Sequence, residues 1–136
     1  TCGMIFQDHK LMPTKTVTEN IAYALEICGY SQTTIRSRTR ELLSLVHMSA
    51  KADAFPGSLS GGEAQRVAIA RALIHEPSVI LADEPTASLD TKNTRMIIEL
   101  LHDIKKRGTT VIFATHDHDL YDLVPEGRVI DLHQWR

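Results

Sequence analysis

The sequence lacks the features that define several broad classes of protein. Its 136 residues contain no apolar run long enough to span a bilayer. Cys2 and Cys28 are the only cysteines, and their spacing fits neither a CxxC motif nor a disulfide framework, so we expect both to be buried free thiols. The formal net charge of -2 gives no indication of a surface that binds nucleic acid.

An initiator methionine is also missing, because Thr1 leads directly into an apolar segment. We therefore expect the chain to be the later part of a longer protein. Its length is suited to one domain.

The first part of the chain predicts one short strand followed by helices. Residues 2–6 are mostly apolar and predict a buried strand that ends at Gln7. Thr16 and Glu19 have the spacing of a capping box, which predicts the start of a helix there. Ser31 can cap a second helix.

The stretch that begins at Ser60 predicts a helix whose first turn can receive an anion. Ser60 and Glu63 form a second capping box, and Gly61 and Gly62 leave the first turn without side chains. A ligand can then approach the backbone N–H groups, and the helix dipole favours a phosphate there. Taken alone, the pattern also fits an ordinary capped helix.

The second half of the chain predicts a strand–helix–strand unit. Residues 78–82 and 109–114 are continuous apolar runs, as expected of parallel strands covered on both faces. Between them, Asp90 can cap a helix with one apolar stripe. A further strand is expected within residues 128–132. The unit indicates an α/β fold with a parallel sheet.

Polar side chains follow three of the expected strands, at the edge where ligands bind in open parallel sheets. They are Gln7, the adjacent acids Asp83 and Glu84, and His116. Asp83 can hold Mg²⁺ through water, and Glu84 can orient or deprotonate a water. His116 can donate to a phosphoryl oxygen. Taken singly, Gln7 is more typical of a loop, the two acids of a solvated pair, and His116 of a structural or exposed histidine. A zinc site within residues 116–118 is disfavoured because its ligands are too close in sequence and no other ligand cluster supports it.

These motifs, in this order, resemble the nucleotide-binding subunit of ABC transporters. The matching segments are Gln7 for the Q-loop, residues 59–63 for the signature motif, residues 79–84 for Walker B with the catalytic glutamate, residues 88–90 for the D-loop, and His116 for the switch histidine. Residues 6–20 resemble the bacterial cell-division ATP-binding subfamily, with lipoprotein-release and macrolide-export ATPases as near relatives.

The resemblance implies a partial P-loop NTPase fold, a parallel sheet with flanking helices, plus an α-helical subdomain. Residues 1–7 would be the end of a core strand and the Q-loop, residues 8–59 the α-helical subdomain, and residues 60–136 the C-terminal part of the ATPase core. Two subunits would face head to tail with ATP between them. An integral membrane transporter or cell-division subunit would hold the protein at the inner, cytoplasmic face of the membrane, and no nucleic acid would be bound.

The resemblance also implies a role for each site residue. Catalysis would fall to Glu84, His116 and Gln7, and the Mg²⁺ ion to Asp83 and Gln7. The ATP held by the other subunit would be bound by Ser60, Gly61, Gly62 and Glu63, with Asp90 reaching across the dimer.

One departure from the family is decisive for activity. The sequence contains no Gly-x-x-x-x-Gly-Lys-Ser/Thr loop, and the aromatic residue that stacks on adenine is missing as well. We therefore expect weak ATP binding, no hydrolysis by this chain alone, and exposed apolar edges that favour self-association.

Two alternatives remain open at this point: a truncated interaction or regulatory module without catalysis, and a chromosome or repair ATPase. The second is disfavoured because only a short stretch without heptads separates Gln7 from Ser60.

Overall fold

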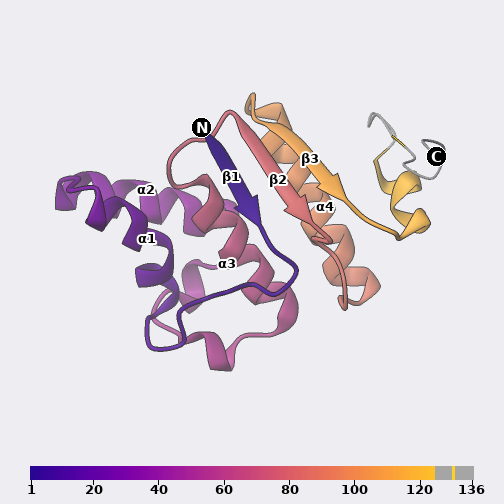
Figure 1. The fold of residues 1–136 in the computed structure, drawn as a ribbon. Helices are drawn as coiled ribbons and strands as arrows, with labels where there is room; N and C mark the ends of the chain where they lie inside the picture. Colours follow the sequence, from indigo (N-terminus) through magenta and orange to yellow (C-terminus); the bar gives the residue numbers. More distant parts are fainter. Residues whose placement is uncertain (125–129, 131–136) are drawn as a thin grey trace.

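The computed structural model describes residues 1–124 and residue 130, and its strands form one parallel sheet (Figure 1). The sheet has three strands in the order β1 (Cys2–Ile5), β2 (Val79–Asp83) and β3 (Thr110–Ala114). Both neighbouring pairs are parallel. The predicted parallel sheet is confirmed, whereas the strand expected within residues 128–132 lies, except for Ile130, outside the described residues.

The segment between β1 and β2 is helical, as predicted. It contains α1 (Val17–Ile27), α2 (Gln32–Leu45), the 3₁₀ turns η1 (Ser49–Lys51) and η2 (Pro56–Ser58), and α3 (Gly61–Leu73). The predicted caps are present: Thr16 and Glu19 form a capping box at α1, and Ser31 accepts from the backbone N–H of Thr34 at α2. After β2 follow α4 (Thr91–Lys106), then β3 and the 3₁₀ segment η3 (His118–Leu123).

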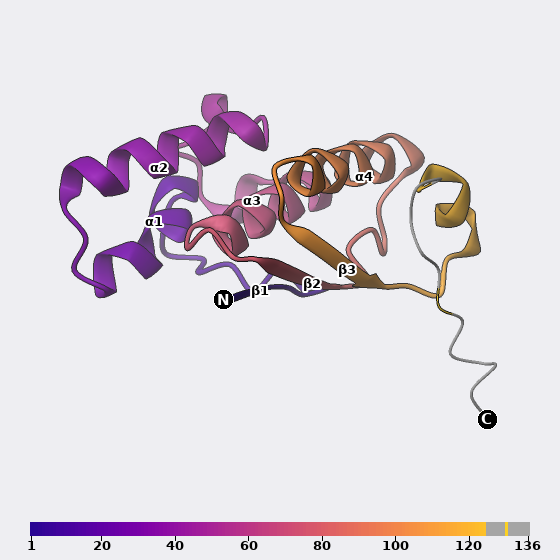
Figure 2. The same ribbon diagram turned by 90° about the horizontal axis from the view of Figure 1, so that it is seen from above.

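The helices of the described residues lie on one face of the sheet (Figure 2). α3 packs against β1 and α4 packs against β3. The approach of α3 is close, because a Cβ atom at Gly3 would lie 2.7 Å from the carbonyl oxygen of Ala72. Ile5, Ile80 and Ala82 point into this covered face and are buried.

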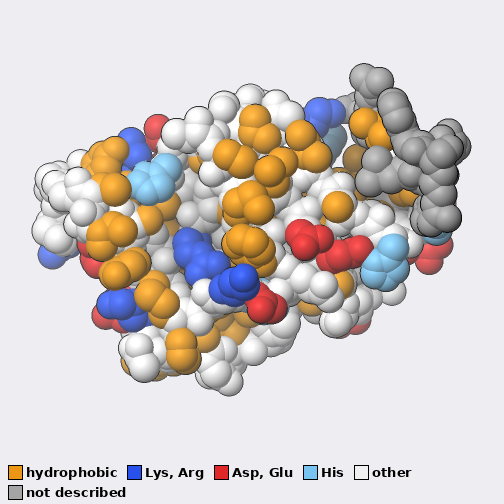
Figure 3. Space-filling view, in the orientation of Figure 1, with side chains coloured by type: hydrophobic (Ala, Val, Ile, Leu, Met, Phe, Trp, Pro, Cys, Tyr) orange, Lys and Arg blue, Asp and Glu red, His pale blue; other side chains and the backbone are white. Residues whose placement is uncertain are grey.

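The other face corrects the expectation that the strands are covered on both sides. Met4, Leu81 and Ile112 are paired in register across the sheet, and Met4 and Ile112 are 44% and 55% exposed. Successive strand residues point to opposite faces, and within the described residues the helices pack on one of them. Hydrophobic side chains therefore gather openly over the strands (Figure 3).

Both cysteines are exposed, so the expectation of buried thiols is wrong. Cys2 alternates with the buried Gly3 and so shares the uncovered face with Met4. Cys28 is the C-cap residue of α1, where the helix ends at the surface and Gly29 takes a positive φ of 76°. No helix among the described residues is long and apolar enough to cross a membrane.

Candidate functional site

The parallel sheet brings the predicted site residues to one edge. β1 is followed by Phe6 and Gln7, β2 ends at Asp83, and β3 is followed by Thr115 and His116. Because the strands are parallel, these positions lie at the carboxyl edge of the sheet.

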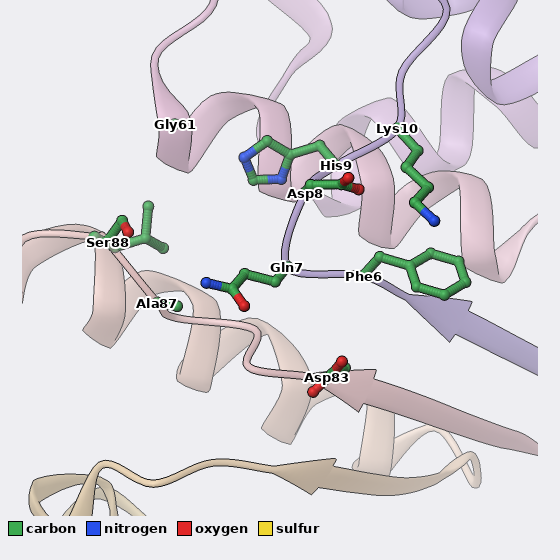
Figure 4. A pocket seen from close by; sticks show the side chains of 10 residues that line it. Phe6, Gln7, Asp8, His9, Lys10, Gly61, Asp83, Ala87 and Ser88 are labelled. Carbon is green, nitrogen blue, oxygen red and sulfur yellow. The ribbon is translucent and has the colours of Figure 1, made fainter.

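A pocket of about 480 Å³ opens at this edge and is lined by residues of four of the predicted motifs (Figure 4). Gln7 and Asp83 line it from the ends of β1 and β2, and Gly61 lines it from the start of α3. Ser88 closes another side, and the Gln7 side chain points toward the loop that carries Ala87 and Ser88. Asp83 is exposed, so its carboxylate is accessible from the pocket.

Glu84 and His116 form a direct pair next to this pocket. The ring Nδ1 of His116 lies 2.5 Å from Glu84 Oε1, and the backbone N–H of His116 donates to the same oxygen at 3.0 Å. The hydroxyl of Thr115 donates to Glu84 Oε2 at 3.2 Å. The positive φ of 47° at Glu84 turns its side chain toward β3, whose Ala114 carbonyl accepts from the Glu84 backbone N–H at 2.9 Å.

This pairing restricts what His116 can do. An ionised carboxylate only accepts hydrogen bonds, so Nδ1 of His116 carries the proton in the pair. In the neutral ring Nε2 is then an acceptor, and donation from Nε2 to a phosphoryl oxygen needs a second proton on the ring. The side chain of Glu84 is 18% exposed and that of His116 is 87% exposed, so the histidine can meet an incoming ligand.

The first turn of α3 has the predicted capping box. Ser60 Oγ accepts from the backbone N–H of Glu63 at 3.2 Å, and Glu63 Oε2 accepts from the backbone N–H of Ser60 at 3.0 Å. Glu63 Oε1 also lies 2.6 Å from Lys51 Nζ. The hydrogen bond from Lys51, followed by the one from the Ser60 backbone, lowers the pKa of Glu63 below its ordinary value. Glu63 is therefore ionised near neutral pH.

The two glycines of this turn differ in their surroundings. Gly61 is exposed to the pocket, and a Cβ atom there would meet only Leu89, at an ordinary contact distance of 3.5 Å. Gly62 is buried, and a Cβ atom there would collide with the side-chain amide of Asn93. Of the two, Gly61 is the one open to a ligand in this chain.

Asp90 caps α4, as predicted. Its Oδ1 accepts from the backbone N–H of Asn93 at 2.8 Å and from the Asn93 side chain at 3.1 Å. Asp90 is exposed. Its expected contact with another subunit stays a prediction, as do the other ligand contacts of the site residues.

Sequence reasoning missed a polar network that ties α3 to the loop after Gln7. The buried Gln65 donates through Nε2 to the carbonyl of Pro85 at 2.9 Å, and its Oε1 lies 2.6 Å from His9 Nδ1. Arg71 donates to the carbonyls of His9 and Lys10 at 2.7 and 2.8 Å, and burial lowers the pKa of its guanidinium. Gln65 lies four residues before Ile69, on the inward face of the helix. A polar side chain at such a position indicates a buried hydrogen-bond partner.

Replacing Gln65 with Leu is expected to lower the free energy of unfolding of the chain by about 1–3 kcal/mol, because the Pro85 carbonyl loses its side-chain donor and His9 its acceptor. Denaturant titration followed by circular dichroism measures the change. The control is Gln32→Leu, at an exposed position at the start of α2. Equal midpoints for the Gln65 variant and the unchanged chain would show that the network adds nothing to stability.

Comparison with protein families matches residues 1–87 to the ABC transporter family. The chain belongs to the ABC transporter family. It is 47% identical over 134 residues to the cell division ATP-binding protein FtsE of Streptococcus pneumoniae, covering 98% of this chain and 58% of that protein. It is 51% identical over 119 residues to the methionine import ATP-binding protein MetN of Myxococcus xanthus, covering 87% of this chain and 36% of that protein.

Solved structures show the same fold in other ABC proteins. A dimeric post-hydrolysis state of the ATP-binding cassette MJ0796, bound to ADP and Pi, has a TM-score of 0.78 and 38% identity, covering 90% of this chain and 55% of that one. The cbiO1 subunit from Clostridium perfringens has a TM-score of 0.82 and 34% identity, covering 92% and 49%. The chain thus spans about half the length of the ABC proteins it matches, and the predicted family and α/β fold are confirmed.

Proposed function

We propose that this chain is the signature and catalytic portion of an ATP-binding and ATP-hydrolysing subunit of an ABC transporter-type complex. The observation that carries the proposal is the Glu84–His116 pair, which lies beside Asp83 at the carboxyl edge of the sheet. A half-buried carboxylate held next to a histidine and an exposed aspartate is an arrangement suited to activating water beside a metal-bound phosphate. The family match supports the same reaction.

The donors at the pocket fit Mg²⁺ and ATP. Asp83 contributes carboxylate oxygens and Gln7 an amide oxygen, and Mg²⁺ is commonly held by one or two such groups while keeping several waters. Mg²⁺, when bound, neutralises charge on the phosphates. Glu84 accepts a proton from the attacking water, and His116 lies where its exposed ring can contact the terminal phosphate.

The signature helix acts on a nucleotide held by a second subunit. Ser60 and Gly61 stand at an exposed helix start, and Gly61 faces the pocket, so the first turn is accessible to a phosphate. Glu63 and the buried Gly62 shape that turn, and Asp90 contacts the partner subunit. The dimeric structures of the cassette MJ0796 support a dimer, and the head-to-tail arrangement is part of the proposal.

The finer assignment follows the relatives named FtsE and the resemblance of residues 6–20. The α-helical subdomain, residues 8–59, and Gln7 transmit the state of the nucleotide to an integral membrane partner of the cell-division or transporter type. The protein then works at the cytoplasmic face of the membrane. Its net charge of -2 favours no nucleic acid partner.

The phosphate-binding loop comes from polypeptide outside these 136 residues, because the sequence contains none. The face of the sheet that carries Met4 and Ile112 is open to contact with that polypeptide. The coding sequence directly upstream of Thr1 tests this: a Gly-x-x-x-x-Gly-Lys-Ser/Thr motif supports the ATPase, and a start codon without that motif favours a module without catalysis.

The isolated chain is expected to hydrolyse ATP no faster than its own Glu84→Gln variant, because it lacks the N–H groups and the lysine that hold the phosphates. The complete ATPase is expected to turn over ATP in the same phosphate-release assay. Glu84-dependent hydrolysis by the isolated chain would contradict the proposal that the missing loop is essential.

A further inference from the structure

The glutamate of the signature motif carries a negative charge at the place where a phosphate is expected. Glu63 is the third residue of α3, and its carboxylate accepts from the backbone N–H of Ser60. The hydrogen bond is useful for the helix, because it satisfies a free N–H group of the first turn. The charge, in contrast, opposes the approach of another anion to the same turn. A glutamine would make the hydrogen bond without the charge.

Lys51 supplies the opposite charge. Its Nζ lies 2.6 Å from Glu63 Oε1, and it reaches α3 from the turn η1, 12 residues earlier in the chain. The side chain of Lys51 is 45% exposed and that of Glu63 is 19% exposed, so the ion pair lies at the surface beside the open helix start. Arg66, on the following turn, also interacts favourably with the Glu63 carboxylate, but Lys51 makes the direct hydrogen bond.

Such a surface ion pair contributes little to the free energy of folding. Its effect on the charge at the start of α3 is the larger consequence. One carboxylate oxygen is used by the capping box and the other by Lys51, so both oxygens of Glu63 are occupied. The first turn then presents its N–H groups without an uncompensated negative charge next to them. Lys51 lies in η1 and Glu63 in α3, so residues of two elements together set the electrostatic potential at the start of α3.

We propose that Lys51 is a positioning residue of the signature motif: it neutralises Glu63 so that the start of α3 can accept the phosphate of ATP held by the partner subunit. The proposal rests on the proposed function. Lys51 acts through Glu63 and does not itself contact the nucleotide. Its effect therefore depends on whether residue 63 is charged, and this dependence separates it from a purely structural contact between η1 and α3.

The test uses the complete ATPase in a Glu84→Gln background, where blocked hydrolysis leaves ATP-driven dimer formation as the readout. Four variants are compared: Lys51→Met, Glu63→Gln, the two combined, and Lys106→Met as a control at an exposed lysine at the end of α4. Sedimentation at increasing ATP concentrations gives the ATP concentration at which dimer formation is half-maximal. Thermal unfolding of each variant is measured alongside, and KM and kcat are measured with Glu84 restored.

Lys51→Met is expected to raise the half-maximal ATP concentration by about three- to tenfold at low salt, and by less at high salt, where the exposed charge is screened. KM rises more than kcat falls. Lys106→Met leaves both values unchanged. Glu63→Gln keeps the capping hydrogen bond without the charge and is the reference value for the combined variant. The combined variant has the same values as Glu63→Gln, because the loss of Lys51 has no effect once residue 63 carries no charge.

Two results would overturn the proposal. A combined variant as impaired as Lys51→Met would mean that Lys51 serves as a structural support or touches the phosphate directly. An unchanged Lys51→Met variant would mean that the charge of Glu63 does not matter. If the protein with Lys51 and Glu63 intact forms no ATP-driven dimer, the proposed function, in which two subunits bind ATP between them, is wrong.

Discussion

Replacing Glu84 with Gln is expected to lower ATP hydrolysis by the complete ATPase by about a hundredfold or more, while ATP binding is retained. The Glu84 carboxylate accepts hydrogen bonds from the backbone and ring of His116 and from Thr115. An amide has the same shape, so the position of His116 is largely preserved. It cannot take a proton from water, and the loss therefore falls on kcat and leaves nucleotide affinity unchanged. Phosphate release under saturating ATP and titration with a fluorescent ATP analogue measure the two quantities.

The matched control for this substitution is Glu99→Gln, at an exposed position on α4 away from the sheet edge. It is expected to leave hydrolysis unchanged, since it removes a charge from the surface without affecting the pair at His116. Near-normal turnover by Glu84→Gln would mean that another group activates the water and that Glu84 only orients His116. Loss of ATP affinity would place Glu84 among the binding groups.

Local features of this fold are readable from sequence because their hydrogen bonds are local. The capping boxes at Thr16 and Ser60 join residues three apart, and the structure contains both. The strands are equally clear, since apolar runs of this length fit a buried parallel sheet. The apolar runs do not specify which element covers each face of the sheet. Met4 and Ile112 are apolar like Ile5 and Ile80, yet the described helices pack on one side only.

The placement of predicted site residues at one sheet edge could be read from the sequence, but their contacts with one another could not. Parallel pairing places Gln7, Asp83 and His116 at one edge, and this follows from the order of the motifs. The hydrogen bond from His116 to Glu84 does not follow, because it joins residues 32 apart and depends on the positive φ of Glu84. Gln65 was missed for a related reason: its partners lie in two loops whose positions are set only by the packing of α3 on β1.

The start of α3 is exposed at the pocket. Gly61 begins α3 with its backbone exposed at the pocket. The backbone of Gly61 therefore lies at the surface of the chain, where a ligand carried by another subunit can reach it. By contrast, the Glu84 side chain is 18% exposed and hydrogen-bonds to Thr115 and His116 of its own chain. The proposed contact with the partner's phosphate thus lies at the exposed start of α3, and the proposed base lies in a more covered position at the same sheet edge.

Replacing Gly61 with Ala is therefore expected to lower ATP hydrolysis by the complete ATPase by about a hundredfold, with ATP binding to the monomer retained. The added methyl group fits within the chain, where it would meet Leu89 at 3.5 Å, so the loss arises from what approaches from outside. Gly62→Ala is a poorer probe, because its methyl group would collide with Asn93 and disturb the cap of α4. Hydrolysis, ATP affinity and ATP-driven dimer formation are measured together.

The control for Gly61→Ala is Gly57→Ala in η2, where a Cβ atom would meet nothing within 4 Å. This variant is expected to match the unchanged protein in all three measurements. Gly61→Ala should bind ATP normally and fail to form the ATP-driven dimer, because the phosphate held by one subunit can no longer approach the backbone of the other. If Gly61→Ala instead loses ATP affinity as a monomer, the start of α3 binds the nucleotide of its own chain, and the head-to-tail arrangement is wrong.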